Sequence, residues 1–302
     1  MSHGRPAAGD GSAGPLRTAP LEARMRILHP TDFSRTAEKA LTVARDLKER
    51  LGGTLHVVHV QTRFEETLGL VRLRPHLDSV NPELERRLEE ARQEEVRRLN
   101  DMLRSLASPD GTYELRWGEP LQELLEMQGD FDLVVMGAHG SNRIDRYFLG
   151  GVAGRFVRRT RVPVITVREE CQVTSVRRAL VATDFSEAAH GAVEAAKGLG
   201  QHGVRLVLCH VVDDPRFRDD PTYMSTVTDA LDLLGDGFER HAIRYGDPAE
   251  ELPAAAQEVG ADLIVIGLKQ QRGAVGLLLG SRVDALIRSS AVPVLAVPTE
   301  VD

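Results

Sequence analysis

Glycines at a fixed spacing are the residues of this sequence whose type and position suit phosphate binding. Gly137 and Gly140 are followed, after nine intervening residues, by Gly150 and then Gly151. Glycine permits positive φ and lets main-chain N–H groups approach an anion closely. A helix is expected to begin near Val152, where free N–H donors and the positive end of the helix dipole attract phosphate. These residues predict a phosphate-binding loop.

The elements that would position this loop follow from hydrophobic periodicity. A short apolar strand is expected at 26–29, and the helix that follows it is expected to end at Gly52. Further strands are predicted at 54–60, 113–117, 133–136 and 164–167, and helices at 81–106, 121–127 and 152–159. The helix over 81–106 mixes apolar residues with Glu and Arg, and we expect it to cover the sheet as an amphipathic helix.

The same order of elements is repeated in the second half of the chain. The segment from Thr31 to Ser34 recurs from Thr183 to Ser186, and the segment 132–137 matches 262–267. Such collinear matches indicate a duplication. Residues 1–23, rich in Gly, Ala, Pro and Ser, are expected to form a disordered tail, with one domain over 24–170 and a second over 175–302.

The fold class follows from the alternation of strands and helices. Strands that read as continuous apolar runs are typical of a parallel sheet covered on both faces. The sequence therefore predicts an α/β protein with two tandem, doubly wound, Rossmann-like parallel sheets. In such sheets ligands bind beyond the carboxyl ends of the strands, where the strand order reverses. The loops after the first and fourth strands of each copy are the candidate sites.

The residues of these two loops carry a family resemblance. The segment from Thr31 to Ser34, together with Gly137, Gly140 and Gly150, resembles the universal stress protein family and its motif Gly-x2-Gly-x9-Gly-(Ser/Thr). The resemblance extends over both halves of the chain. Some members of that family bind ATP through this motif, whereas others lack the motif and bind none.

The two copies depart from the motif at different positions. Gly151 stands where the first copy should have a hydroxyl residue, and Gln270 replaces the second glycine of the second copy. Losing one hydrogen-bond donor costs about 1 kcal/mol of binding. A non-glycine residue held at positive φ is strained by about 1 kcal/mol or more, and glutamine also fills space. ATP is therefore expected in the first domain only.

The resemblance implies roles for further residues. Thr31 and Asp32 would lie beside the adenosine part of ATP, Val58 and Val60 would form a wall for adenine, and a divalent metal such as Mg²⁺ would bridge the phosphates. His139 would lie beside the phosphates. The candidate ATP-binding residues are therefore Thr31, Asp32, Val58, Val60, Gly137, His139, Gly140, Gly150, Gly151 and Val152.

Purely structural interpretations of the same residues stay open. Asp32 or Ser34 would satisfy the first N–H groups of the following helix as a cap. Val58 and Val60 would belong to a core strand, and the glycines would form a tight turn. His139 would be an exposed loop residue, a hydrogen-bond donor to phosphate or a general base.

Composition narrows the function classes. With 42% hydrophobic and 27% charged residues the chain resembles a soluble globular protein, and no apolar run approaches the roughly 20 residues of a membrane span. A net charge of −7 argues against nucleic-acid binding. The basic run Arg155, Arg158, Arg159 and Arg161 is predicted to form a solvated helix face. Two cysteines without CxxC spacing indicate neither a disulfide framework nor a zinc site, and suit the cytoplasm.

No catalytic motif is present. The sequence has no P-loop, nucleophile elbow or His-Glu-x-x-His motif, so slow ATP hydrolysis is the most that we expect. An enzyme of the adenine-nucleotide α-hydrolase-like fold ranks last, because the Ser-Gly-Gly-x-Asp-(Ser/Thr) loop expected after the first strand is absent. We expect a cytoplasmic stress-response protein that binds ATP in its first domain as a nucleotide-dependent regulator. The alternative is a nucleotide-free tandem protein that binds an apolar ligand or a partner protein.

The last strand of each copy raises the question of assembly. Strands 164–167 and 294–297 would be sheet edges, which need pairing or protection. The resemblance implies that such strands pair across a dimer. Within one chain they would form an intramolecular pseudo-dimer, with a homodimer of the whole chain as a further option.

Overall fold

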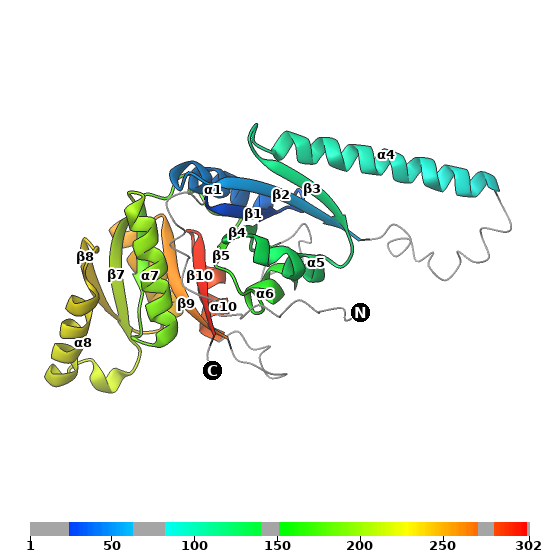
Figure 1. The fold of residues 1–302 in the computed structure, drawn as a ribbon. Coiled ribbons are helices and arrows are strands. Elements are labelled where there is room, and N and C mark those ends of the chain that lie inside the picture. Colours follow the sequence, from blue (N-terminus) through cyan, green and yellow to red (C-terminus); the bar gives the residue numbers. More distant parts are fainter. Residues whose placement is uncertain (1–23, 63–81, 140–150, 271–280, 301–302) are drawn as a thin grey trace, which may run out of the picture.

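The computed structural model describes residues 24–62, 82–139, 151–270 and 281–300 (Figure 1). The elements of the first half are β1 (Arg26–Pro30), α1 (Arg35–Arg50), β2 (Thr54–Gln61), α4 (Pro82–Leu106), β3 (Thr112–Trp117), α5 (Pro120–Met127), η2 (Gln128–Asp130), β4 (Leu133–Gly137), α6 (Gly151–Val157) and β5 (Val164–Val167). All strands and helices expected from the sequence of this half are present, with ends displaced by a few residues. Gly52 follows α1 with a φ of 63°, as its role as a helix stop requires.

The second half repeats this order with shorter connections. Its elements are β6 (Arg178–Ala182), α7 (Glu187–Gln201), β7 (Arg205–Val212), η4 (Pro215–Phe217), α8 (Pro221–Leu234), β8 (Arg240–Tyr245), α9 (Pro248–Val259), β9 (Leu263–Gln270), α10 (Ser281–Ser289) and β10 (Val294–Glu300). The helix α8 has 14 residues where α4 has 25, so part of the extra length of the first copy lies in this helix.

The strands of both halves form one continuous sheet. Its order is β3-β2-β1-β4-β5-β10-β9-β6-β7-β8. Neighbouring strands are parallel within each half, and the strand order reverses between β1 and β4 and again between β6 and β9. The α/β, doubly wound class is confirmed. The two predicted sheets are, however, joined into a single layer.

The two halves are joined where β5 and β10 pair antiparallel. Ile165 lies opposite Leu295, and Val164 lies opposite Ala296. All four side chains are buried, and burying a large aliphatic side chain contributes roughly 1.5–3 kcal/mol. The expected pairing of the two edge strands within one chain is confirmed, because each supplies both the hydrogen-bonding edge and the apolar surface that the other lacks.

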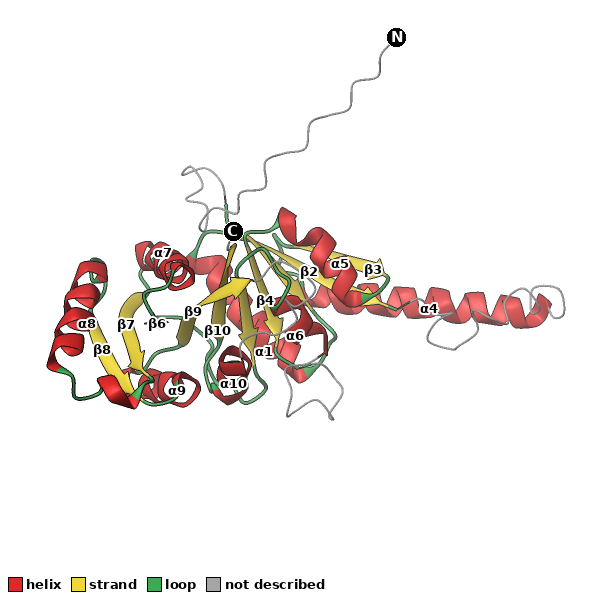
Figure 2. Cartoon of the chain, turned by 90° about the horizontal axis from the view of Figure 1, so that it is seen from below, coloured by secondary structure: helices red, strands yellow, loops and turns green. Residues whose placement is uncertain are grey.

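Helices cover both faces of the sheet (Figure 2). On one face, α1, α4, α7 and α8 pack on an apolar cluster that includes Leu47, Leu103 and Leu231. On the other face, α5, α6, α9 and α10 pack on a cluster that includes Phe156 and Leu286. Each cluster draws residues from both halves, so the joined sheet has one continuous core on each face.

The prediction that α4 covers the sheet along its length is only partly correct. Leu99 and Leu103 near its C-terminal end are buried, whereas residues 86–94 are almost all exposed. Figure 1 shows the helix extending away from the sheet beyond β3. The cause is a mismatch of lengths: 25 helical residues span about 37 Å, whereas the eight residues of β2 span about 26 Å. Ion pairs at i,i+3 and i,i+4 spacing, such as Arg86 with Glu83 and Glu90, line the projecting part.

His29 on β1 makes stability sensitive to pH. Its ring is fully buried and its Nδ1 lies 2.9 Å from the carbonyl oxygen of Val135. Burial lowers its pKa from 6.5 to about 4. The unfolded chain takes up this proton at a higher pH than the folded chain does. The contribution of neutral His29 to the free energy of unfolding is therefore fully present above pH 6.5, and it is lost as the pH falls toward 4, by at most about 3 kcal/mol.

We therefore expect urea denaturation to give a free energy of unfolding that falls from pH 7 to pH 4 and falls less steeply in His29→Leu. The exposed His190 offers the control variant His190→Gln, which should keep the wild-type slope. A His29→Leu protein with the wild-type slope would contradict the assignment of this pH dependence to His29.

Candidate functional site

A crevice of about 320 Å³ opens at the point in the first half where the strand order reverses. This volume lies within the range of small-molecule sites. The lining residues come from the ends of β1, β2 and β4, from the start of α1 and α5, and from α6. They are Pro30, Thr31, Asp32, Ala37, Val58, His59, Val60, Pro120, Leu124, Met136, Gly137, His139, Gly151, Val152, Ala153 and Arg155.

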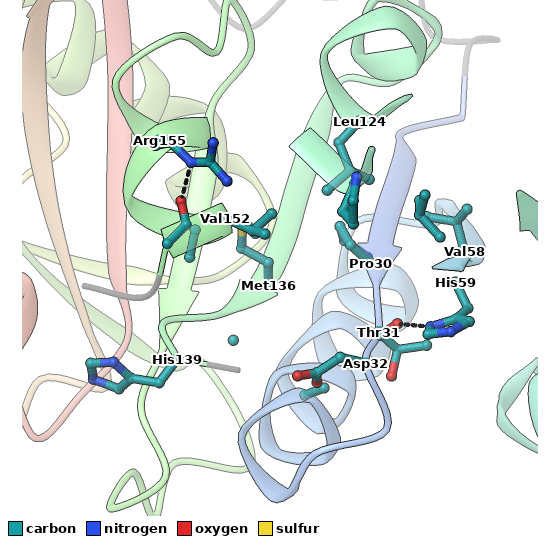
Figure 3. A pocket seen from close by; sticks show the side chains of 16 residues that line it. Pro30, Thr31, Asp32, Val58, His59, Leu124, Met136, His139, Val152 and Arg155 are labelled. Atoms are coloured by element: carbon teal, nitrogen blue, oxygen red, sulfur yellow. Dashed lines mark hydrogen bonds between the residues drawn. The ribbon is translucent and has the colours of Figure 1, made fainter. Parts of the chain in front are cut away.

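Eight of the ten residues predicted from the sequence line this crevice. They are Thr31, Asp32, Val58, Val60, Gly137, His139, Gly151 and Val152. Gly140 and Gly150 lie outside the described residues. In Figure 3, Thr31 and Asp32 lie on one side of the crevice and His139, Val152 and Arg155 on the other, with Met136 between them. The fold therefore brings together segments that are far apart in the sequence.

The loop after β1 is held by its own side chains. Thr31 Oγ1 accepts a hydrogen bond from the Phe33 N–H at 3.0 Å, and Asp32 Oδ1 accepts one from the Ser34 N–H at 3.1 Å. Ser34 Oγ accepts one from the Ala37 N–H at 3.2 Å, so it caps α1. The capping interpretation is thus confirmed for Ser34. It leaves the crevice position of Thr31 and Asp32 unchanged, since both residues also line the crevice.

The same loop is strained in both halves. Phe33 has a φ of 60° and Phe185, its counterpart, a φ of 62°. This conformation costs a non-glycine residue about 1–2 kcal/mol. In each half a histidine on the neighbouring strand supports it: Nδ1 of His59 lies 2.7 Å from the Thr31 carbonyl oxygen, and the ring centroids of His59 and Phe33 are 4.7 Å apart. His59 is buried and also lines the crevice.

Gly137 has a role in packing in addition to its predicted place at the crevice. It is not among the described residues with positive φ, so a left-handed conformation is not the reason for a glycine at this position. A Cβ here would lie 3.0 Å from Cγ2 of Thr36 and 3.2 Å from the main-chain nitrogen of Ala37. The glycine therefore allows the first turn of α1 to lie against the end of β4.

Gly151 begins α6, one residue before the expected start near Val152, and it too is not among the described residues with positive φ. A Cβ at this position would meet no heavy atom of the described residues within 4 Å. The crevice thus has room for the hydroxyl residue that the motif calls for. The absence of a side chain at Gly151 is not required by packing.

Arg155 is exposed, as predicted for a solvated helix face, but it is also a crevice residue, which was not predicted from the sequence. It lines the crevice one turn after Gly151, and its Nε donates to the Gly151 carbonyl oxygen at 2.6 Å. One guanidinium nitrogen lies 3.5 Å from a carboxylate oxygen of Glu119, and the side chain is 49% exposed. The helical i,i+4 spacing from Gly151 is the signal that would have placed it on the crevice side.

Arg158, in contrast, does not lie on a solvated face, whereas Arg159 and Arg161 are exposed as predicted. Its guanidinium donates to Asp284 of α10 at 2.6 Å, with side-chain exposures of only 23% and 18%. The sequence had no means of showing this contact, because the two residues are 126 positions apart and meet only when β5 pairs with β10.

The corresponding region of the second half is built differently. Arg282, at the position of Val152, pairs with Asp213 at the end of β7 at 2.5 Å. Cys209 stands at the position of Val58, and burial raises the pKa of its thiol to about 12. A Cβ on Gly267 would overlap the main-chain carbonyl of Ala188. The helix α7 therefore lies closer to β9 than α1 lies to β4.

Comparisons with known proteins agree with the duplication. A model of the universal stress protein family matches residues 23–168 and 175–298. The universal stress protein Rv2005c of Mycobacterium tuberculosis is 27% identical over 199 residues, which cover 60% of this chain and 67% of that protein. The universal stress protein MJ0577 of Methanocaldococcus jannaschii is 25% identical over 155 residues, or 48% of this chain and 95% of that protein.

Among solved structures, a universal stress protein from Archaeoglobus fulgidus has a TM-score of 0.66 and 24% identity. The match covers 90% of this chain and 98% of that chain, and it shows a shared fold. In the described part of the present chain, none of the helices has the length and hydropathy needed to cross a membrane.

Proposed function

The chain belongs to the universal stress protein family, and on this premise we propose that it binds ATP in the crevice of its first half. The proposed domains are residues 24–170 and 175–302, and ATP would bind the first of them. The observation that carries the proposal is the convergence of eight motif-derived residues on one crevice at the reversal of strand order.

The walls of the crevice suit an adenosine. Val58 and Val60 on β2 form one side, while Leu124 and Met136 add apolar surface from α5 and β4. Adenine is flat and largely apolar on its faces, so such walls bind it by exclusion of water. Thr31, Asp32 and their main chain lie at the polar end, where the ribose would bind.

The α6 side of the crevice suits phosphates. The first N–H groups of α6 lie at Gly151 and Val152 and have no partner within a helix, and the Arg155 guanidinium adds a positive charge. Among the described residues no three His, Cys, Asp or Glu side chains form a metal site. Magnesium would therefore be bound mainly by the phosphates, with Asp32 as the nearest carboxylate lining the crevice.

A regulatory role is proposed because α6 connects the crevice to the second half. Its first residues line the crevice, and Arg158, just past its end, donates to Asp284 of α10. A nucleotide that repositions α6 would alter this partly buried ion pair. We thus propose that the protein is a cytoplasmic stress-response regulator and forms a pseudo-dimer within one chain. It would use ATP as a ligand and hydrolyse it slowly at most.

Isothermal titration calorimetry with ATP and Mg²⁺ tests the proposal. One saturable site per chain is expected. Two sites of equal affinity would contradict the assignment to the first half, and no binding at millimolar ATP would contradict ATP binding altogether. In the latter case the apolar walls favour the second candidate function, in which the crevice binds an apolar ligand of a nucleotide-free protein.

Restoring the hydroxyl of the motif is expected to tighten binding. Gly151→Ser places an O–H donor at the start of α6, where the Cβ meets no neighbouring atom within 4 Å. One added hydrogen bond to a charged phosphate is worth about 1.5 kcal/mol, or about tenfold in the dissociation constant. Gly151→Ala is the matched control, because it adds the same Cβ without a donor. Equal affinities of the two variants would contradict a phosphate beside residue 151.

A further inference from the structure

A second cavity, of about 240 Å³, lies on the opposite face of the sheet, between α1 and the C-terminal end of α4. Its walls are mostly apolar and include Phe33, Leu41, Met102 and Leu106, and the buried His29 forms part of its lining. The loop after β1 separates this cavity from the crevice, since Thr31 lines both. Of the predicted ATP-binding residues that the structure describes, Thr31 alone also lines this second cavity.

His29 presents an unused hydrogen-bond acceptor. Its Nδ1 lies 2.9 Å from the Val135 carbonyl oxygen, which can only accept, so Nδ1 carries the proton. The ring is neutral at pH 7, because burial lowers its pKa to about 4. Nε2 therefore holds a lone pair, and in the described structure this atom is buried without a hydrogen-bond partner. A buried acceptor of this kind is costly unless it is satisfied.

Three hydroxyl oxygens around the cavity already take part in hydrogen bonds within the protein. Thr31 Oγ1 accepts from the Phe33 N–H, Ser34 Oγ accepts from the Ala37 N–H, and Ser105 Oγ donates to the Met102 carbonyl oxygen at 2.6 Å. The exposed Glu38 lies at the rim, and no described Lys or Arg lines the cavity. Among the described lining residues, His29 Nε2 is the buried acceptor without a hydrogen-bond partner, and the carboxylate at the rim disfavours anions.

We propose that this cavity binds a compact, uncharged molecule with an aromatic or aliphatic body and one O–H or N–H group, which donates to Nε2 of His29. The volume suits such a ligand, because an apolar protein cavity of about 150 Å³ is enough to bind benzene, whereas one water takes up only about 30 Å³. The site is specific to the first half. Val181, which occupies the position of His29 in β6, offers no acceptor.

Phenol and toluene are the matched probes, because they differ only in O–H against CH₃. Titration of the full chain with phenol, monitored by calorimetry or by the shift in melting temperature, should show saturable binding. His29→Leu should weaken phenol binding by about tenfold and leave toluene binding unchanged. Leu106→Trp should block both probes by filling the cavity, whereas Leu234→Trp, at the half-buried C-terminal end of α8, should block neither.

Nitrogen NMR of the imidazole rings gives a readout on the wild-type chain, so the test survives if a variant fails to fold. Phenol should shift the Nε2 resonance of His29, and toluene should shift it much less. The proposal is overturned if phenol does not bind, if His29→Leu binds phenol as tightly as wild type, or if the Nε2 resonance stays unmoved at saturating phenol.

Discussion

Replacing Val60 by tryptophan is expected to reduce ATP affinity by at least about a hundredfold, or some 2.7 kcal/mol. Val60 is half-buried on β2 and lines the crevice. An indole at this position would occupy the space between β2 and α5 that the adenine needs. Because the position is only partly buried, the larger side chain should be accommodated without unfolding. Calorimetric titration with ATP and Mg²⁺ measures the change, and circular dichroism checks the fold.

The duplication supplies the control for this experiment. Val211 is the counterpart of Val60 on β7 and is likewise half-buried. If ATP binds only in the first half, Val211→Trp should keep the wild-type dissociation constant. Loss of ATP binding in Val211→Trp, together with retained ATP binding in Val60→Trp, would instead assign ATP to the second half. The Arg282–Asp213 ion pair and the close approach of α7 to β9 would then not prevent nucleotide binding in that half.

Gly267→Ala is expected to destabilise the protein by about 3 kcal/mol or more. The added Cβ would overlap the main-chain carbonyl of Ala188 and lie 2.7 Å from the main-chain nitrogen of Ala189. Backbone atoms of a helix start cannot rotate away, so α7 itself would have to shift from the sheet. Denaturation in urea gives the free energy of unfolding, and the slope of the transition reports whether unfolding stays cooperative.

Two other glycines provide comparison variants for this prediction. Gly137→Ala should cost less than Gly267→Ala, because the closest contact is the methyl group of Thr36 at 3.0 Å, which can yield slightly. Gly151→Ala should leave stability unchanged or raise it, since its Cβ meets nothing within 4 Å and alanine favours the helix. Equal effects of all three substitutions would show that the close approach of α7 does not limit position 267.

Gly137 and Gly151 show how much of a site can be predicted from local sequence. Spacing was enough to place Gly137 and Gly151 at one crevice, because strands of a doubly wound sheet end at a common edge. Spacing was not enough to say why they are glycines. Neither residue uses the positive φ that glycine permits, and the reason for glycine at position 137 is its close distance to α1, which is a property of the packed structure.

Arg155 and Arg158 illustrate a second limit. A run of arginines in a helix looks solvated when only the helix is considered. Arg155 lines the crevice because α6 packs beside β4, and Arg158 reaches Asp284 because β5 and β10 join the halves. The contact of Arg158 depends on a partner 126 positions away, so no local pattern predicts it, whereas the i,i+4 spacing from Gly151 is a local signal for Arg155.

The sequence by itself determined the order of the elements, the duplication and the parallel α/β class, and it indicated that the last strand of each copy needs pairing or protection. The elements follow from the periodicity of neighbouring residues, and the duplication follows from collinear matches between the two halves. The pairing of the two last strands with each other was implied by the family resemblance. Only the tertiary structure decided that the two sheets form one layer, that α4 extends past the strands it covers, and that His29 lies buried beside a second cavity. Those features depend on lengths, distances and unsatisfied atoms, which arise only when segments far apart in the chain are packed together.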